Sequence, residues 1–107
     1  MSHLQTQCKL FQFDRVFSPK SSQRDIFEEV QSLIQSAMEG FNVCIMAYGQ
    51  TGSGKTFSMI GEDENPGLYF SAADEIYRIL RAKQSHVEFD LSVSVIEIYN
   101  EQIRDLL

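Results

Sequence analysis

Residues 41–56 read Phe41-Asn-Val-Cys-Ile-Met-Ala-Tyr-Gly49-Gln-Thr-Gly-Ser-Gly-Lys-Thr56, and this stretch sets the expected architecture. Its first half is an almost continuous apolar run, which is typical of a parallel β-strand buried on both faces. Its second half, residues 49–56, fits the G-x-x-x-x-G-K-[ST] pattern of a phosphate-binding loop. We call residues 49–56 the phosphate loop.

The residue types in the phosphate loop each have a chemical reason. A glycine-rich turn directs several backbone N–H groups inward around phosphate oxygens. Lys55 is expected to reach the β- and γ-phosphates, and the Thr56 hydroxyl to complete the coordination of a Mg²⁺. A helix from Lys55 to about Ile60 would direct its positive end at the anion. The pattern therefore predicts a nucleoside triphosphate site. The alternative is an ordinary surface loop, which the flanking strand and helix disfavour.

Composition narrows the class of protein. The 107 residues are enough for one small domain, and 43% hydrophobic content is ordinary for a globular chain. A net charge of −6 without a basic tract disfavours a nucleic-acid partner. No signal peptide and no membrane-spanning stretch is visible, so we expect a soluble cytoplasmic protein without a membrane partner. Cys8 and Cys44 match no metal-ligand spacing and are expected to be buried thiols in a reducing compartment.

The first part of the chain predicts a strand followed by a helix. Residues 9–13 alternate like a short strand. Ser22 is a suitable N-cap, with Asp25 three residues later as a capping box. Apolar residues then recur at helical spacing up to Met38, and Gly40 is expected to close the helix at a C′ position.

The second part continues the alternation. An acidic loop covers residues 61–65. Its last residue, Asn65, is expected to be the N-cap of another helix, with Pro66 as the first helical residue. On that helix Asp74 and Arg78 are expected to form an i,i+4 ion pair. Residues 87–95 alternate like a long strand with one buried face, a turn follows at residues 100–101, and another element begins near residue 103. Strand, helix, strand, helix, strand predicts an α/β layered fold with a mostly parallel central sheet.

Hydrolysis requires more than a phosphate loop, above all an acid at the end of a second buried strand. Asp90 falls inside an alternating strand, and Asp63 lies in the acidic loop, so neither suits the role. Glu97 is expected to be a structural partner. The sequence therefore supplies no candidate catalytic residue.

Four segments together resemble the N-terminal part of a kinesin motor domain. They occur in the family's order and extend over nearly the whole chain. The sequence of residues 40–45 is similar to that of the kinesin-14, minus-end-directed branch. The segments are Phe11-Gln-Phe-Asp-Arg-Val-Phe17, Gln23-Arg-Asp-Ile-Phe27, residues 40–59 and residues 96–107.

The resemblance implies a P-loop NTPase-type layered fold, with a central mostly parallel sheet flanked by helices, that is incomplete in this chain. It also implies an ATPase that moves along microtubules, and hence a place on the microtubule cytoskeleton. Thr56 would coordinate Mg²⁺, and Phe57 falls where the family often has His or Tyr beside the adenine. The residues that the resemblance assigns to ATP are Gly49, Gln50, Thr51, Gly52, Ser53, Gly54, Lys55, Thr56 and Phe57.

Departures from the family pattern limit these expectations. The Arg-x-Arg-Pro, Asn-x-x-Ser-Ser-Arg-Ser-His and Asp-Leu-Ala-Gly-Ser-Glu segments of the family are absent. Residues 1–107 are thus expected to be the N-terminal part of a motor domain truncated at its C-terminal end, with the microtubule-binding surface in the missing part. Such a chain alone is expected to fold poorly and not to hydrolyse ATP. Two alternatives stay open: a short non-catalytic product that binds nucleotide or tubulin, and a small-molecule kinase. The kinase would need lid arginines, whereas Arg78 and Arg81 lie on an amphipathic helix.

Overall fold

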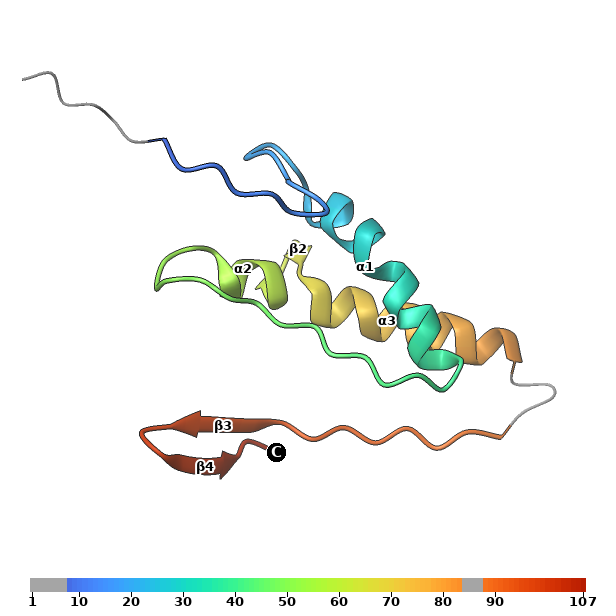
Figure 1. Cartoon of the computed structure of the whole chain (residues 1–107). Coiled ribbons are helices and arrows are strands. Elements are labelled where there is room, and N and C mark those ends of the chain that lie inside the picture. The colour runs from blue at the N-terminus through green and yellow to red at the C-terminus, as the bar shows by residue number, and fades with distance from the viewer. Residues whose placement is uncertain (1–7, 84–87) are drawn as a thin grey trace, which may run out of the picture.

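The computed structural model describes residues 8–83 and 88–107 (Figure 1). It contains three helices and two hairpins in these ranges. Each hairpin is a two-stranded antiparallel sheet, β1 with β2 and β3 with β4. In chain order the elements are α1 (Gln23–Met38), α2 (Lys55–Met59), β1 (Gly61–Glu62), β2 (Asn65–Pro66), α3 (Leu68–Lys83), β3 (Ile96–Tyr99) and β4 (Gln102–Asp105).

Helix α1 begins and ends where the sequence predicts. The Ser22 backbone N–H donates to Asp25 Oδ2 at 2.7 Å, and the Asp25 N–H donates to Ser22 Oγ at 3.2 Å. This reciprocal pair confirms the capping box. At the other end Gly40 has φ +100° and donates its N–H to Ala37 O, which confirms the C′ glycine.

The core lies between α1 and α3, which run side by side (Figure 1). Its buried apolar side chains are Ile34, Leu68 and Leu80. Gln31 Nε2 on α1 donates to Glu75 Oε1 on α3 at 3.0 Å and joins the two helices beside this core. Only these three apolar side chains are buried within residues 8–83 and 88–107, so most other apolar residues there keep substantial exposure.

The predicted start of the third helix is wrong. Asn65 and Pro66 are not N-cap and first helical residue but form β2, paired with Glu62 and Gly61 of β1. Helix α3 begins at Leu68 instead. Gly61, with φ +78°, follows the end of α2 and turns the chain into β1, and the hairpin reverses at residues 63–64. The Gly67 N–H donates to Ile60 O at 2.8 Å and closes the open end of the hairpin. Backbone hydrogen bonds thus fold the acidic loop back on itself, and no local side-chain pattern predicts them.

The predicted Asp74–Arg78 ion pair is also wrong. Arg78 Nη2 and Nε lie 2.6 and 2.7 Å from the two carboxylate oxygens of Glu75, one residue closer in sequence. Glu75 is the acid that α1 holds in place through Gln31. Because its carboxylate is already oriented and only 10% exposed, it offers Arg78 a fixed bidentate partner.

The three predicted strands at residues 9–13, 41–47 and 87–95 do not form as strands; residue 87 lies outside the described ranges. Residues 9–13, 41–47 and 88–95 have no strand assignment. Along residues 41–48 the exposure alternates: Ile45 and Ala47 are half-buried, whereas Met46 and Tyr48 are 78% and 97% exposed. One face of this segment is therefore covered, and the expected burial on both faces is wrong.

Both cysteines differ from expectation for the same reason. Cys8 and Cys44 are exposed free thiols, not buried ones. A strand covers its side chains only when neighbouring strands and layers pack on it, and the described residues provide no strand beside either cysteine.

The C-terminal hairpin contains the predicted turn. Asn100 and Glu101 have φ +49° and +60°, the two positive values that a type I′ turn requires. β4 begins at Gln102, opposite Tyr99 of β3. Glu97, expected to be a structural partner, lies opposite Arg104 across the ladder.

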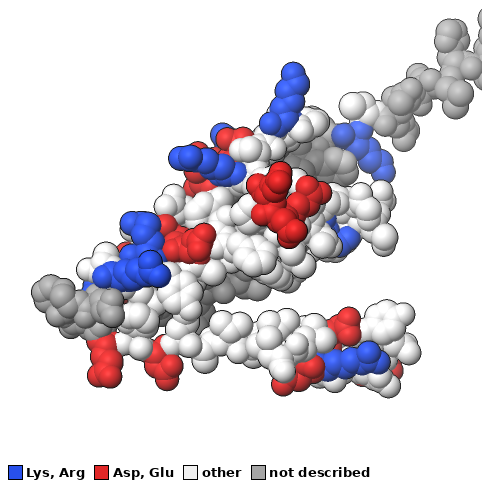
Figure 2. Space-filling view, turned by 180° about the vertical axis from the view of Figure 1, so that it is seen from behind, with Lys and Arg blue, Asp and Glu red and all other residues white. Residues whose placement is uncertain are grey.

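The whole chain is open and elongated. Its radius of gyration is 18.6 Å, against about 13 Å for a compact domain of similar length. Figure 2 shows the C-terminal segment as a separate strip along the helical body, with acidic and basic side chains mixed on both. The predicted central parallel sheet is absent from the described residues, whose strand pairs are all antiparallel. No helix in the described ranges has the length and apolar character needed to cross a membrane.

Candidate functional site

The phosphate loop lies between the extended residues 41–48 and helix α2 (Figure 1). The Ser53 N–H donates to Gln50 O at 3.2 Å and closes a turn at its centre. Gly52 and Gly54 have φ +78° and +91°, in the left-handed region that other residues rarely adopt. Alternating backbone conformations of this kind turn successive N–H groups toward one side and create a concave anion site.

Gly49 is required for a different reason, which is space. A Cβ at this position would lie 2.5 Å from Ser53 Oγ and 3.3 Å from Ser53 Cβ. Even the smallest side chain would therefore push on the far wall of the loop. This close approach shows that residues 49 and 53 face each other across a narrow loop.

Lys55 crosses the loop from its C-terminal end. Its Nζ donates to Gly49 O at 2.6 Å and to Gln50 O at 2.7 Å. An ammonium group has three donors, so two hold the side chain against the loop and the third is free to meet an anion. The two carbonyl oxygens thus orient the cation at the site where phosphate oxygens are expected.

Helix α2 begins at Lys55, as predicted, so that the last two residues of the phosphate loop form its first turn, and it ends one residue before the expected Ile60. Its N-cap is Gly54, and no side chain of the described residues caps its first turn. The first N–H groups of a helix have no partner within it, so those of α2 remain available to an anionic ligand. Thr56 in this turn is exposed, and Phe57 is 44% exposed.

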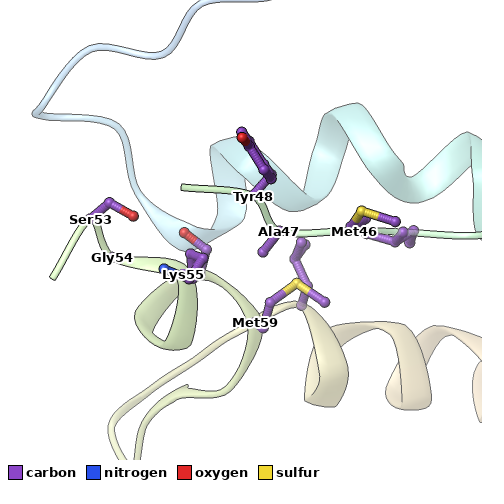
Figure 3. A pocket seen from close by; sticks show the side chains of 10 residues that line it. Met46, Ala47, Tyr48, Ser53, Gly54, Lys55 and Met59 are labelled. Carbon is purple, nitrogen blue, oxygen red and sulfur yellow. The ribbon is translucent and has the colours of Figure 1, made fainter. Parts of the chain in front are cut away.

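Two hollows adjoin the loop. The hollow on its outer side, of about 520 Å³, is lined by six of the nine predicted ATP-binding residues: Thr51, Gly52, Gly54, Lys55, Thr56 and Phe57. The hollow on its inner side, of about 300 Å³, lies between residues 45–48 and α2 (Figure 3). There Met59 and Lys55 lie on one side of the extended chain while Tyr48 points away from them (Figure 3).

The described residues fit a nucleotide with its magnesium ion at the outer hollow. Its lining holds backbone N–H groups, the Lys55 side chain and the hydroxyls of Thr51 and Thr56, which are the kinds of group that bind phosphate oxygens and Mg²⁺. The two acids considered for hydrolysis do not line this hollow: Asp63 lies in the β1–β2 turn and Asp90 in the extended residues 88–95. The described ranges also hold no group of three or more His, Cys, Asp or Glu residues arranged for a metal.

Sequence reasoning missed one residue next to the site. Gln23, the first residue of α1, is 6% exposed, and its Nε2 donates to the carbonyl oxygen of Phe57 at 2.6 Å. No hydrophobic periodicity marks a glutamine at a helix start. Its only signal in the sequence was its place in the segment 23–27 that carries the family resemblance.

Comparisons with known proteins agree on one family. The model of the kinesin motor domain matches residues 2–107. Kinesin-like protein KIN-14Q of Oryza sativa subsp. japonica is 49% identical over 104 residues, which are 94% of this chain and 11% of that protein. Kinesin-like protein KIN-14R of Arabidopsis thaliana is 46% identical over 99 residues, 92% of this chain and 9% of that protein.

Solved structures give the same result. The C-terminal motor domain of Kar3 from Candida glabrata matches with a TM-score of 0.73 and 41% identity, covering 88% of this chain and 31% of that one. A mutant structure of a kinesin motor ATPase matches with a TM-score of 0.72 and 39% identity. These likenesses show a P-loop NTPase-like α/β fold. The chain spans about a tenth of the length of the kinesin-like relatives and less than a third of the solved motor domain.

Proposed function

This chain belongs to the kinesin motor domain family, and from that premise we propose that it is the ATP-binding part of a microtubule-based motor. The complete protein would couple ATP hydrolysis to movement along microtubules, as a member of the kinesin-14 branch on the cytoskeleton. The observation that carries the proposal is the phosphate loop itself. Its glycines adopt the backbone that an anion cradle needs, and Lys55 is held across it by two carbonyl oxygens.

Each residue of the site has a proposed role toward MgATP. The backbone N–H groups from Gly49 to Lys55 would surround the phosphates, and the ammonium of Lys55 would neutralise the β- and γ-phosphates. The Thr56 hydroxyl would hold Mg²⁺, which bridges the phosphates and offsets their charge. The half-exposed ring of Phe57 would lie against the adenine, without the polar group that His or Tyr offers.

We propose that residues 1–107 form part of one motor domain and bind nucleotide without a catalytic residue of their own. Asp63 and Asp90, the acids weighed for that role, do not line the hollow beside the phosphate loop. In a complete domain the extended residues 41–48 would pair into a central, mostly parallel sheet, because one of their faces is already covered. Microtubule contact would come from other parts of the domain.

A titration of the 107-residue chain with a fluorescent ATP analogue and Mg²⁺, read by anisotropy, tests the proposal. We expect saturable binding that Lys55→Ala weakens at least about tenfold, or about 1.4 kcal/mol, because the charge facing the phosphates is lost. Lys20→Ala is the matched control, since it removes an exposed lysine from the turn before α1. Equal affinity of the Lys55→Ala and wild-type chains would show that the loop has been wrongly assigned.

A phosphate-release assay separates binding from hydrolysis. We expect no microtubule-stimulated release by residues 1–107, which the non-catalytic alternative also predicts. Stimulated release would contradict the proposal that this chain lacks its catalytic groups. The kinase alternative gains no support, since Arg78 is engaged by Glu75 and does not reach the loop.

A further inference from the structure

We infer that Gln23 is a positioning residue for the phosphate loop: its carboxamide fixes helix α2, which carries Lys55 and Thr56. The inference rests on the proposed nucleotide site and adds a residue to it from a distant part of the chain. Gln23 and Phe57 are 34 residues apart, and the 2.6 Å bond from Gln23 Nε2 to Phe57 O ties the start of α1 to α2. In Figure 1, α2 continues directly from the loop.

The Phe57 carbonyl needs a partner that α2 cannot provide. The last carbonyl groups of any helix have no N–H of the same helix to accept from. Helix α2 has five residues; Ser58 N–H donates to Gly54 O, and Ile60 N–H donates to Thr56 O. No backbone N–H of the described residues donates to Phe57 O. The Gln23 amide fills this position and acts as a side-chain cap on the C-terminal turn of α2.

Helix α2 is too short to hold its own orientation. Isolated helices of this length are not stable in water, so contacts from outside must keep α2 in place. Helix α1 is a suitable anchor because it is capped by Ser22 and Asp25 and packs along α3. A tether at Phe57 is one residue from Thr56 and two from Lys55, and therefore limits where both side chains can point.

The chemistry of Gln23 favours use of its N–H group over simple space filling. Its Oε1 is buried and has no hydrogen-bond partner among the described residues. A methionine would fill similar space without an unpaired buried oxygen. The unpaired Oε1 of Gln23 therefore costs stability, and the hydrogen bond that its Nε2 donates is the interaction that offsets this cost. The amide orientation follows from the contact, because the reverse orientation would bring two oxygens together.

Nucleotide affinity of Gln23 variants of the 107-residue chain tests the inference. We expect Gln23→Met to weaken binding of the fluorescent MgATP analogue about tenfold. The matched control is Gln31→Met, which cuts the α1–α3 bond instead and is expected to leave affinity within about twofold, a change of about 0.4 kcal/mol. Equal affinities of the Gln23→Met and wild-type chains would overturn the inference.

A second variant separates the hydrogen bond from packing. Gln23→Glu has nearly the same shape, but its carboxylate cannot donate to Phe57 O. We expect weak binding at pH 8 and recovery toward wild-type affinity as pH falls and the buried carboxyl gains a proton, because burial raises its pKa. Asp25 does not titrate in this range, since the Ser22 hydrogen bonds lower its pKa. A Gln23→Glu chain whose affinity relative to wild type does not change with pH would contradict a role for the donated bond.

Hydrogen exchange without nucleotide distinguishes failure of this inference from failure of the proposed function. Gln23→Met should speed exchange of the α2 amides at residues 58–60 while those in the middle of α1 and α3 keep their protection. Unchanged exchange at residues 58–60 would overturn the inference whether or not the chain binds ATP. Faster exchange there in Gln23→Met than in wild type, together with a wild-type chain that binds no nucleotide, would support the tether and contradict the proposed function alone.

Discussion

At the scale of single residues, the shape of the phosphate loop depends on glycines, which have no side chain. At Gly49 a side chain would meet Ser53, which occupies the adjacent space. Gly54 lacks a Cβ because its φ of +91° is strained for other residues. Lys55 supplies the one positive charge of the loop. Two glycines and one lysine thus provide shape and charge, and backbone N–H groups provide the remaining donors.

Substitution of Gly49 tests the shape argument. Gly49→Ala should weaken MgATP-analogue binding about tenfold, because its Cβ would meet Ser53 Oγ at 2.5 Å and widen the loop. Ser53→Ala in the same chain should recover part of the loss, since the clashing atom is removed. Anisotropy titrations of both single variants and the double variant give the coupling. Purely additive effects would show that the two side chains do not compete for this space.

At the scale of elements, α1 and α3 are joined by a polar cluster as well as by their apolar core. Glu75 accepts from Arg78 on its own helix and from Gln31 on α1. The Arg78 hydrogen bonds, and then the Gln31 bond, lower the pKa of Glu75 from 4.5 to about 2. The same contact raises the pKa of Arg78. The carboxylate therefore stays charged in the folded chain at pH values where the unfolded chain takes up a proton.

The lowered pKa gives a direction for the dependence of stability on pH. The Glu75 contribution is fully present above about pH 4.5 and is lost as pH falls toward 2, because protonation then removes the acceptor. Thermal unfolding followed by circular dichroism should show a smaller fall in Tm over this range for Glu75→Gln than for wild type. Glu28→Gln, in an exposed pair with Arg24, is the control and should behave like wild type. An identical acid dependence in all three chains would contradict this assignment.

At the scale of the whole molecule, the helical pair is too small to cover the apolar residues of the chain. The accessible surface is 10372 Å², whereas a compact protein of this length exposes about 6,000 Å². Much of the excess lies on the extended residues 41–48 and on the segment from residue 88 to 107, where Val93 is 72% and Ile98 70% exposed. Extended apolar backbone without a partner strand is a template for association with another chain.

We therefore expect the 107-residue chain to self-associate as its concentration rises. Val93→Lys should reduce light scattering and shift sedimentation toward the monomer, because it replaces an apolar contact by a charge. Ser92→Lys adds the same charge one residue earlier without removing apolar surface and should have a smaller effect. A monomeric wild-type chain, or equal effects of the two lysines, would show that apolar exposure at Val93 does not drive association.

Features that depend on neighbours in sequence were predictable. The capping box of Ser22 and Asp25, the C′ glycine at Gly40, the phosphate loop leading into α2 and the turn at residues 100–101 all follow from short-range backbone geometry. Each of these features is formed by a few consecutive residues, so the residue types that cause it can be seen together in the sequence. The ATP-binding roles assigned to residues 49–57 stay a prediction.

Features that depend on distant partners were not predictable. Residues 41–47 have the composition of a buried strand, but a strand exists only where another strand accepts its hydrogen bonds. Asn65 and Pro66 suit a helix start, yet the turn at residues 63–64 pairs them with β1 in a hairpin. Arg78 had two acids within helical spacing, and it contacts Glu75, the one that Gln31 of another helix also contacts. The sequence alone thus determined the caps of α1, the phosphate loop, the turn at residues 100–101 and the family, whereas the tertiary structure decided the strand pairings and the contact of Gln23 with Phe57. The physical reason is that these contacts join residues far apart in the chain.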